Sequence, residues 1–304
     1  MNASFGIDHP LIAVNDIAKV RLHLENMGFQ MTPIGKHPWG TSTSLAMFEG
    51  CLIEIMGIYD DTLLDVNPAG SFHFGRHVHK HLMQREGVAL SALHSTNIAQ
   101  DLNRAKAAGL NISGTLEFGR DVTLPDGQQG RTKTTLALLP DEQFTRLSFF
   151  LCQQHRPDLI YVPKWMAHKN TVYTIAGITI VANHNEQGAL LRKFEPVYGT
   201  AKKQEAGFSV DTANGRIQVS EPKAIEQRFG ALPFDHQAHN EPAIIAMDFY
   251  CQSIETLETF LTHSNIAFID AKTNPYQPQA KSLLVSDASL TGNTFFQFIE
   301  KQKP

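Results

Sequence analysis

The sequence predicts an α+β fold in which four βαβββ modules pair into two domains with half-open, barrel-like clefts. The length of 304 residues and the hydrophobic fraction of 42% allow two buried cores of roughly 150 residues each. A pattern of strand, helix and turn also recurs four times along the chain. One module alone would leave a sheet face uncovered, so the repeat predicts that the modules pair.

Each copy of the repeat opens with a short apolar strand and continues with an amphipathic helix that ends at a left-handed turn residue. The apolar residues change from alternation in the strand to the 3.6-residue period of a helix. Glycine and asparagine tolerate the left-handed conformation that commonly ends a helix. The opening strands are expected at residues 9–14, 88–93, 177–182 and 243–249, and the turn residues are Gly28, Gly109, Gly199 and Asn265.

Short β-like runs follow each helix and complete the module. Hairpin turns are indicated by the dipeptides Glu49-Gly50, Asp126-Gly127 and Asn214-Gly215. The runs lie at residues 43–48, 51–58, 131–138, 147–152, 207–210, 216–219, 282–286 and 294–299. The repeating unit is therefore βαβββ.

Two stretches interrupt the repeat. Residues 59–86 form an insertion with a loop and then a helix, expected from Phe74 to Arg85. Residues 155–173 contain two prolines and show neither a helical nor an alternating period, which predicts a connector between domains. The resulting boundaries are 1–158 for the N-terminal domain, 159–173 for the connector and 174–304 for the C-terminal domain.

Charge and apolar runs argue against several kinds of partner. The 26 basic and 30 acidic residues are scattered, and a net charge of -4 provides no positive field for nucleic acid or anionic lipid. No apolar run approaches the ~20 residues that span a bilayer, and the first residues lack the features of a signal peptide. We therefore expect a cytoplasmic protein.

The isolated Cys51, Cys152 and Cys251 predict three reduced thiols. No glycine-rich phosphate loop is present, which predicts no nucleotide cofactor.

Several segments of the first half carry a resemblance to a known family. They are residues 8–14, 24–29, 35–41 and 52–56, followed by residues 154–158 and 165–170. The first four resemble a glyoxalase-type module of the vicinal oxygen chelate superfamily, and the last two are similar to its glyoxalase-like subgroup. As a fold the resemblance covers nearly the whole chain, and its motifs are specific in residues 5–58 and 146–182. It implies two glyoxalase-like domains and a small-molecule ligand or substrate.

The resemblance also implies a metal site with an incomplete set of ligands. In metal-using members, a His and a Glu from one module and a matching pair from its partner module hold a divalent ion, which binds neighbouring oxygens of a substrate. His9 and Glu54 match the first pair. Opposite His9, the partner module has Gly87 or Leu90, depending on the alignment, and opposite Glu54 it has Phe150 or a close neighbour. Iron, manganese, nickel or zinc is the metal cofactor implied.

The corresponding positions of the C-terminal domain contain no typical metal ligand. They carry Gly177 or Ile180, Pro242 or Ala246, and Gln218. We therefore expect a metal-free C-terminal domain that acts as a packing partner or a binding lobe.

Three further histidines lie near the expected cleft of the N-terminal domain. His37 belongs to a turn of the subgroup motif, His155 follows the last strand, and His94 ends the first strand of the second module. We assign His37 with His9 and Glu54 to the catalytic set, and His155 with His9 and Glu54 to the metal site. A histidine near a turn is more often a hydrogen-bonded surface residue, which is the alternative for each of the three.

Aromatic and basic residues supply the expected substrate contacts. Trp39 and Phe150 offer apolar surface for a small molecule, and Arg120 can pair with a carboxylate. A separate histidine run, His73 to His81, lies in the inserted helix, where His77 and His81 share one face at a spacing that can bind zinc or nickel. No general base accompanies the run, so we interpret it as a solvated helix face.

Two functions follow from these observations. The first is an enzyme, a lyase, isomerase or dioxygenase of the glyoxalase type, acting on a small oxygenated metabolite with His9 and Glu54 as metal ligands or as an acid and base. The second is a non-catalytic small-molecule binding or drug-sequestering protein of the same fold. The missing partner pair favours binding, whereas the retained His9 and Glu54 favour the enzyme. A homodimer is left open as the oligomeric state.

Overall fold

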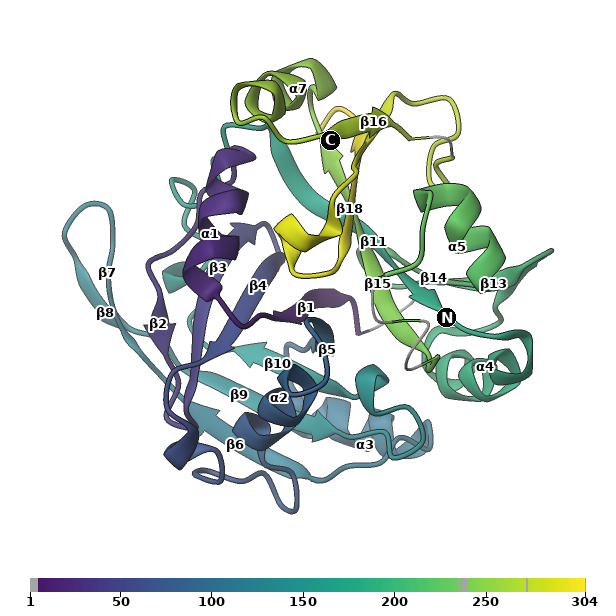
Figure 1. Ribbon diagram of the computed structural model, residues 1–304. Helices are drawn as coiled ribbons and strands as arrows, with labels where there is room; N and C mark the ends of the chain where they lie inside the picture. The colour runs from purple at the N-terminus through teal and green to yellow at the C-terminus, as the bar shows by residue number, and fades with distance from the viewer. Residues whose placement is uncertain (1–4, 234–235, 237–239, 272, 304) are drawn as a thin grey trace.

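The computed structural model describes residues 5–233, 236, 240–271 and 273–303. Within this part of the chain, an N-terminal sheet has eight strands in the order β2-β3-β4-β1-β5-β10-β9-β6 (Figure 1). Its strands are β1 (Ile7–Ala13), β2 (Gly35–Lys36), β3 (Thr41–Phe48), β4 (Cys51–Ile58), β5 (Gly87–His94), β6 (Gly114–Phe118), β9 (Thr134–Leu139) and β10 (Phe149–Gln154). A separate hairpin of β7 (Asp121–Thr123) and β8 (Gln129–Arg131) extends from this sheet.

The C-terminal sheet repeats this arrangement strand for strand. Its described strands follow the order β12-β13-β14-β11-β15-β18-β17-β16. They are β11 (Val172–Val181), β12 (Lys202–Gln204), β13 (Gly207–Asp211), β14 (Arg216–Ser220), β15 (Ala243–Cys251), β16 (Phe268–Asp270), β17 (Ser282–Val285) and β18 (Phe295–Glu300). In each sheet the first strands of two modules pair antiparallel at the centre, β1 with β5 and β11 with β15. The predicted α+β fold of four paired βαβββ modules is confirmed.

One helix of each module follows its opening strand. These helices are α1 (Ile17–Asn26), α3 (Ile98–Ala107), α4 (His184–Tyr198) and α7 (Ile254–His263). Asp16, Asn97 and Ser253 cap three of them, because each side chain accepts a hydrogen bond from a backbone N–H of the first turn. The inserted helices α2 (Phe74–Leu82) and α5 (Pro222–Phe229) lie outside the module pattern. Short 3-10 turns are η1 (Asp61–Leu63), η2 (Thr145–Leu147), η3 (Pro157–Leu159) and η4 (Ala288–Thr291).

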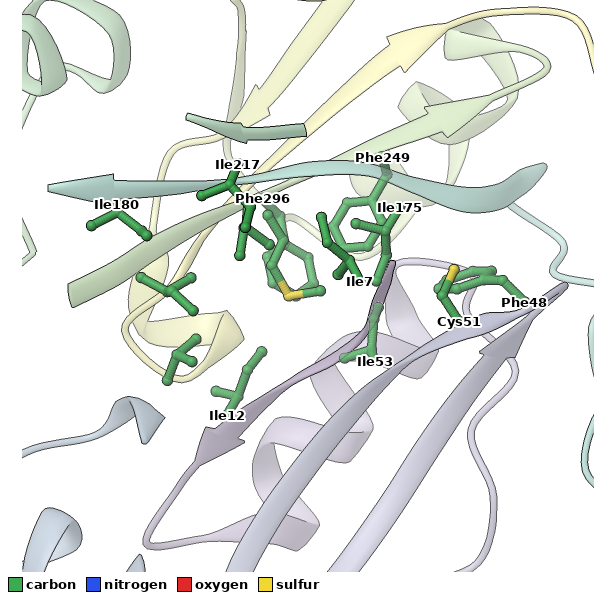
Figure 2. Packing of buried hydrophobic residues seen from close by; sticks show 14 of the residues in the cluster. Ile7, Ile12, Phe48, Cys51, Ile53, Ile175, Ile180, Ile217, Phe249 and Phe296 are labelled. Atoms are coloured by element: carbon green, nitrogen blue, oxygen red, sulfur yellow. The ribbon is translucent and has the colours of Figure 1, made fainter. Parts of the chain in front are cut away.

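The two sheets share one hydrophobic core. Figure 2 shows Ile12 and Ile53 of the N-terminal sheet facing Ile217 and Phe296 of the C-terminal sheet, and all four are buried in a single cluster. Because side chains alternate between the two faces of a strand, the neighbouring residues of β1 and β4 point to the opposite face. That opposite face of the N-terminal sheet is concave and carries the site described below.

Between the two sheets, the chain leaves β10 at Gln154 and enters β11 at Val172. Side chains anchor this segment to the first module. His168 Nδ1 accepts from the backbone N–H of Gln30 at 2.9 Å, so its Nε2 donates to the carbonyl of Met47 at 2.8 Å. The sequence of this segment predicts no regular strand or helix. Side-chain hydrogen bonds therefore hold it against the first module.

Candidate functional site

A pocket of about 530 Å³ lies in the concave face of the N-terminal sheet. Strands β1, β3, β4, β9 and β10 form its floor, while residues 30–35, the hairpin strand β7 and the segment after β10 contribute to its walls. Its lining is mostly apolar, with a few polar groups directed at one volume. This combination and size are typical of small-molecule sites, which span about 300–1,000 Å³.

His9 and Glu54 meet on the floor of this pocket. Strands β1 and β4 pair in parallel, in a register that places Glu54 beside the residue two positions after His9. His9 Nε2 lies 3.0 Å from Glu54 Oε2, and both side chains are almost fully buried. The second carboxylate oxygen of Glu54 accepts a hydrogen bond of 2.5 Å from the hydroxyl of Thr43. The predicted pair therefore exists as a direct contact.

Asp8 completes a chain of hydrogen bonds through the His9 imidazole. Its Oδ1 lies 2.6 Å from His9 Nδ1, and the Asp8 side chain is fully buried. Neighbouring strand residues normally face opposite sides, but the pairing of β1 with β5 shifts register between Ile7 and His9. Asp8 is not among the site residues predicted from the sequence. Its position directly before the candidate histidine was the available signal.

Both charges of the pair are stabilised by their surroundings. Burial acts to lower the pKa of His9, but hydrogen bonds and charges from Asp8 and Glu54 outweigh it and raise this pKa to about 10. Burial acts to raise the pKa of Glu54, yet its contact with His9 outweighs this and lowers the pKa to about 2. At neutral pH the group is thus an imidazolium held between two carboxylates.

His37 lies in the wall of the same pocket as a neutral imidazole. Its Nδ1 is 3.0 Å from the hydroxyl of Thr41, and its ring stacks on the indole of Trp39 with centroids 4.8 Å apart. Burial and the nearby charge of Arg120 lower the pKa of His37 to about 3. Uncharged at neutral pH, His37 can offer a hydrogen bond but no ionic attraction.

Six of the seven residues assigned from the sequence line this one pocket. They are His9, His37, Trp39, Glu54, Arg120 and Phe150. The ring of Phe150 meets the His9 imidazole edge to face, with centroids 5.6 Å apart. His155 is the exception: it is exposed, and its Nε2 bonds to the hydroxyl of Thr135 at 2.8 Å. Phe150, Cys152 and Gln154 line the pocket, so the next residue points away from it.

Strand register identifies the positions that match His9 and Glu54 in the second module. The residue two positions after His9 pairs with Leu90, and the residue two positions after Leu90 lies beside Phe150, as in the first module. Leu90, not Gly87, is therefore the equivalent of His9, and Phe150 is the equivalent of Glu54. Both are buried in one hydrophobic cluster, and Phe150 lines the pocket.

This donor set does not fit a resident divalent metal. His9 Nε2 and Glu54 Oε2 are two donors, whereas resident catalytic metals typically have three or more protein ligands. Leu90 and Phe150 supply none, and His155 lies outside the pocket. Across residues 5–233, 236, 240–271 and 273–303, no group of three or more His, Cys, Asp or Glu side chains is placed to hold a metal ion.

The equivalent face of the C-terminal sheet is filled by its own side chains. By register, the four equivalent positions carry Gly177, Gln218, Ala246 and Gln297. Arg228 of α5 forms an ion pair with the buried Asp248 and donates to Gln297 and Thr179. The Tyr276 hydroxyl donates to Asp248 at 2.8 Å, and a Cβ on Gly177 would lie 2.4 Å from that hydroxyl oxygen.

The histidine run of α2 does not form a solvated face, contrary to the interpretation from sequence. His81 is buried, and Nε2 of the half-buried His77 lies 3.1 Å from the carbonyl of Ala89 in β5. Burial lowers the pKa of both side chains. The two histidines share a face, as their spacing predicts, but that face packs against the sheet because α2 lies on β1, β4 and β5.

Comparison with known proteins agrees with this architecture. The profile of the family described as Glyoxalase-like domain matches residues 7–193. A hypothetical protein from Staphylococcus aureus is similar in structure, with a TM-score of 0.65 and 10% identity over 96% of this chain and 98% of that one. No functionally curated protein matches the sequence. No described helix is long and apolar enough to cross a membrane.

Two further solved structures share the fold at low identity. A mutant of 4-hydroxymandelate synthase from Streptomyces coelicolor has a TM-score of 0.58 and 12% identity over 99% of this chain and 94% of that one. A fusion of a xylose isomerase-like TIM barrel with 4-hydroxyphenylpyruvate dioxygenase has a TM-score of 0.57 and 12% identity over 100% of this chain and 50% of that one. From the profile match over residues 7–193, the chain belongs to the glyoxalase-like domain family.

Proposed function

We propose that the N-terminal pocket is the active site of a lyase or isomerase that moves a proton at a carbon next to a carbonyl of a small oxygenated metabolite. Glu54 is the base and His9 is the acid. The observation that carries the proposal is the hydrogen-bonded series Asp8, His9 and Glu54, in which His9 and Glu54 line a mostly apolar pocket. Buried charges in such a setting are typical of catalytic sites.

Substrate binding would convert the resting ion pair into a working acid and base. A carbonyl oxygen placed at His9 Nε2 replaces Glu54 as the hydrogen-bond acceptor. Without that bond, burial makes Glu54 a stronger base. The C–H bond then breaks and its proton passes to Glu54, the electron pair shifts toward the carbonyl, and His9 protonates the oxygen to give an enol. Glu54 then gives its proton back to carbon and the enol hydroxyl returns its proton to His9, which restores both groups. An isomer forms when the proton returns to a different carbon or to the other face, and Asp8 holds the imidazole in place throughout.

A non-catalytic binding role is the second candidate. Apolar Leu90 and Phe150 stand at the two positions that match His9 and Glu54, and both are buried in one hydrophobic cluster. The loss of polar groups at these positions favours a binding role. The two solved relatives with enzyme names include a dioxygenase. The donors of this pocket do not fit the metal that a dioxygenase reaction would need.

The decisive experiment follows deuterium exchange by proton NMR in D₂O. The probes are 3-benzoylpropanoate, 2-oxo-4-phenylbutanoate, 4-oxopentanoate and the carboxamide of each acid, all of which have a C–H bond beside a carbonyl. We expect the wild-type protein to accelerate exchange of at least one probe, and Glu54→Gln to reduce the rate roughly 100-fold or more.

Glu49→Gln is the matched control, because Glu49 is an exposed glutamate outside the pocket. It should leave the exchange rate unchanged. Tight binding of a probe without any acceleration of exchange would support the binding role and refute the enzyme.

A further inference from the structure

Arg120 lies at the base of the hairpin that forms one wall of the pocket. Its backbone N–H donates to the hydroxyl of Thr132 at 2.9 Å, and its carbonyl accepts from the backbone N–H of Thr132 at 2.8 Å. These two bonds close the hairpin and fix the point from which the side chain starts. The side chain lines the same pocket as His9 and Glu54.

The wall opposite this side chain is shaped to admit the guanidinium. A Cβ on Gly35 would lie 2.7 Å from Arg120 Nη1, so any side chain there would displace the charged group. On another side, the guanidinium carbon lies 6.0 Å from the centroid of the Phe118 ring. The charge is therefore held against apolar walls, where its solvation is incomplete.

This guanidinium has no anionic partner in the described part of the chain. Elsewhere carboxylates pair with Arg76, Arg85, Arg104, Arg131, Arg156 and Arg228. Glu54 faces the same pocket, but its two oxygens are engaged by His9 and Thr43. A partly buried cation without a partner is costly, and a carboxylate that offers two parallel hydrogen bonds is its best complement.

We infer that the ligand of this pocket is a small monocarboxylate with an apolar body. Its carboxylate binds Arg120, and its aryl or alkyl body lies against the stacked His37 and Trp39. The ketone or aldehyde oxygen reaches His9; this last placement rests on the proposed function, whereas the anion site does not. His9 is not a competing anion site, because Asp8 and Glu54 already flank it.

The experiment compares the affinity of each acid named above with that of its carboxamide by isothermal titration calorimetry. Acid and amide differ in charge at one end and are nearly equal in shape. We expect at least one acid to bind roughly tenfold more tightly than its amide, which is about 1.4 kcal/mol. Arg120→Gln should remove this preference.

Two further variants separate loss of the guanidinium from loss of its position. Gly35→Ala keeps the charge but displaces it, so the preference for the acid should fall. Arg156→Gln removes an exposed arginine whose ion-pair partner, Asp158, also lies outside the pocket, and should keep the preference.

Failure of this inference is distinguishable from failure of the proposed function. If no acid binds, if acid and amide bind equally, or if the preference survives in Arg120→Gln, the inference is overturned. Deuterium exchange at carbon tests the proposed function separately. Exchange can persist for the amides even if Arg120 does not bind a carboxylate. Exchange can also be absent for an acid that binds through Arg120, in which case only the proposed function fails.

Discussion

The imidazole of His9 sets the chemistry of the pocket because both of its nitrogens are engaged by carboxylates. Asp8 and Glu54 lie 2.6 and 3.0 Å from the two nitrogens. The sequence predicted His9 and Glu54 as a pair. It also predicted that His37 and Arg120 lie at the same cleft. Asp8 was missed because adjacent strand residues normally face opposite ways, and a register shift of one strand pairing leaves no trace in the sequence.

Asp8→Asn tests the role of the buried aspartate through the pH dependence of stability. Because the pKa of His9 in the folded chain is about 10, above the ordinary 6.5, its contribution to stability is complete below pH 6.5 and is lost as the pH rises toward 10. Without the Asp8 charge, this pKa falls toward its ordinary value. Urea unfolding at pH 7 and pH 10 should therefore show a smaller loss of stability for Asp8→Asn than for wild type. An equal loss in both proteins would contradict this role.

The pKa of His37 affects folding stability at acid pH, whereas that of His9 affects it at alkaline pH. Its pKa in the folded chain, about 3, lies below the ordinary 6.5, so the unfolded chain binds a proton first as the solution is acidified. Stability must then fall between pH 6.5 and 3, and about 2 kcal/mol of the loss between pH 7 and pH 5 should come from His37. His37→Gln should flatten this slope in urea unfolding, whereas His184→Gln, at an exposed site, should not. An unchanged slope in His37→Gln would show that the group titrates normally.

At the scale of elements, strand pairing determines which side chains face the pocket. The sequence predicted β4 at residues 51–58, as observed, because an apolar run between turn residues is a strong signal. It missed β6, which alternates exposed and buried residues over only five positions, and α5, which lies outside the repeat. The register that makes Leu90 and Phe150 equivalent to His9 and Glu54 became clear only from the pairing of the strands.

This register leads to a gain-of-function prediction. Leu90→His combined with Phe150→Glu should add two donors to His9 and Glu54 and give a set of four. We expect the double variant to bind one equivalent of Co²⁺, visible in its absorption spectrum, and to gain thermal stability with the metal. Leu90→Ala with Phe150→Ala is the matched control and should bind none. A folded double variant that binds no Co²⁺ would show that the four positions do not converge.

At the scale of the whole molecule, the two sheets are coupled through one core and through specific polar contacts. Asn214, predicted only as a turn residue, accepts from the backbone N–H of Ile7 at 2.7 Å and donates to its carbonyl at 2.8 Å. The repeat in the sequence predicts four modules. It does not predict which faces meet, because both faces of the central strands are apolar.

The shared core should make unfolding a single cooperative event. Calorimetry of the full chain should show one transition, and a chain ending at residue 158 should fail to fold because it exposes Ile12, Ile53 and their neighbours. Two separate transitions, or a stable fragment of residues 1–158, would mean that the sheets are independent domains.

Asn214→Ala should lower the stability of the full chain by about 1–3 kcal/mol.

The protonation state of the His9 ring distinguishes a buried ion pair from a metal ligand, and ¹⁵N NMR of the imidazole nitrogens in tag-free protein measures it. We expect an imidazolium with two protonated nitrogens at pH 8, unchanged when Fe²⁺, Mn²⁺, Ni²⁺ or Zn²⁺ is added in turn. A neutral ring at pH 8, or a signal that one of these metals shifts at one equivalent, would contradict the buried ion pair and make His9 a metal ligand.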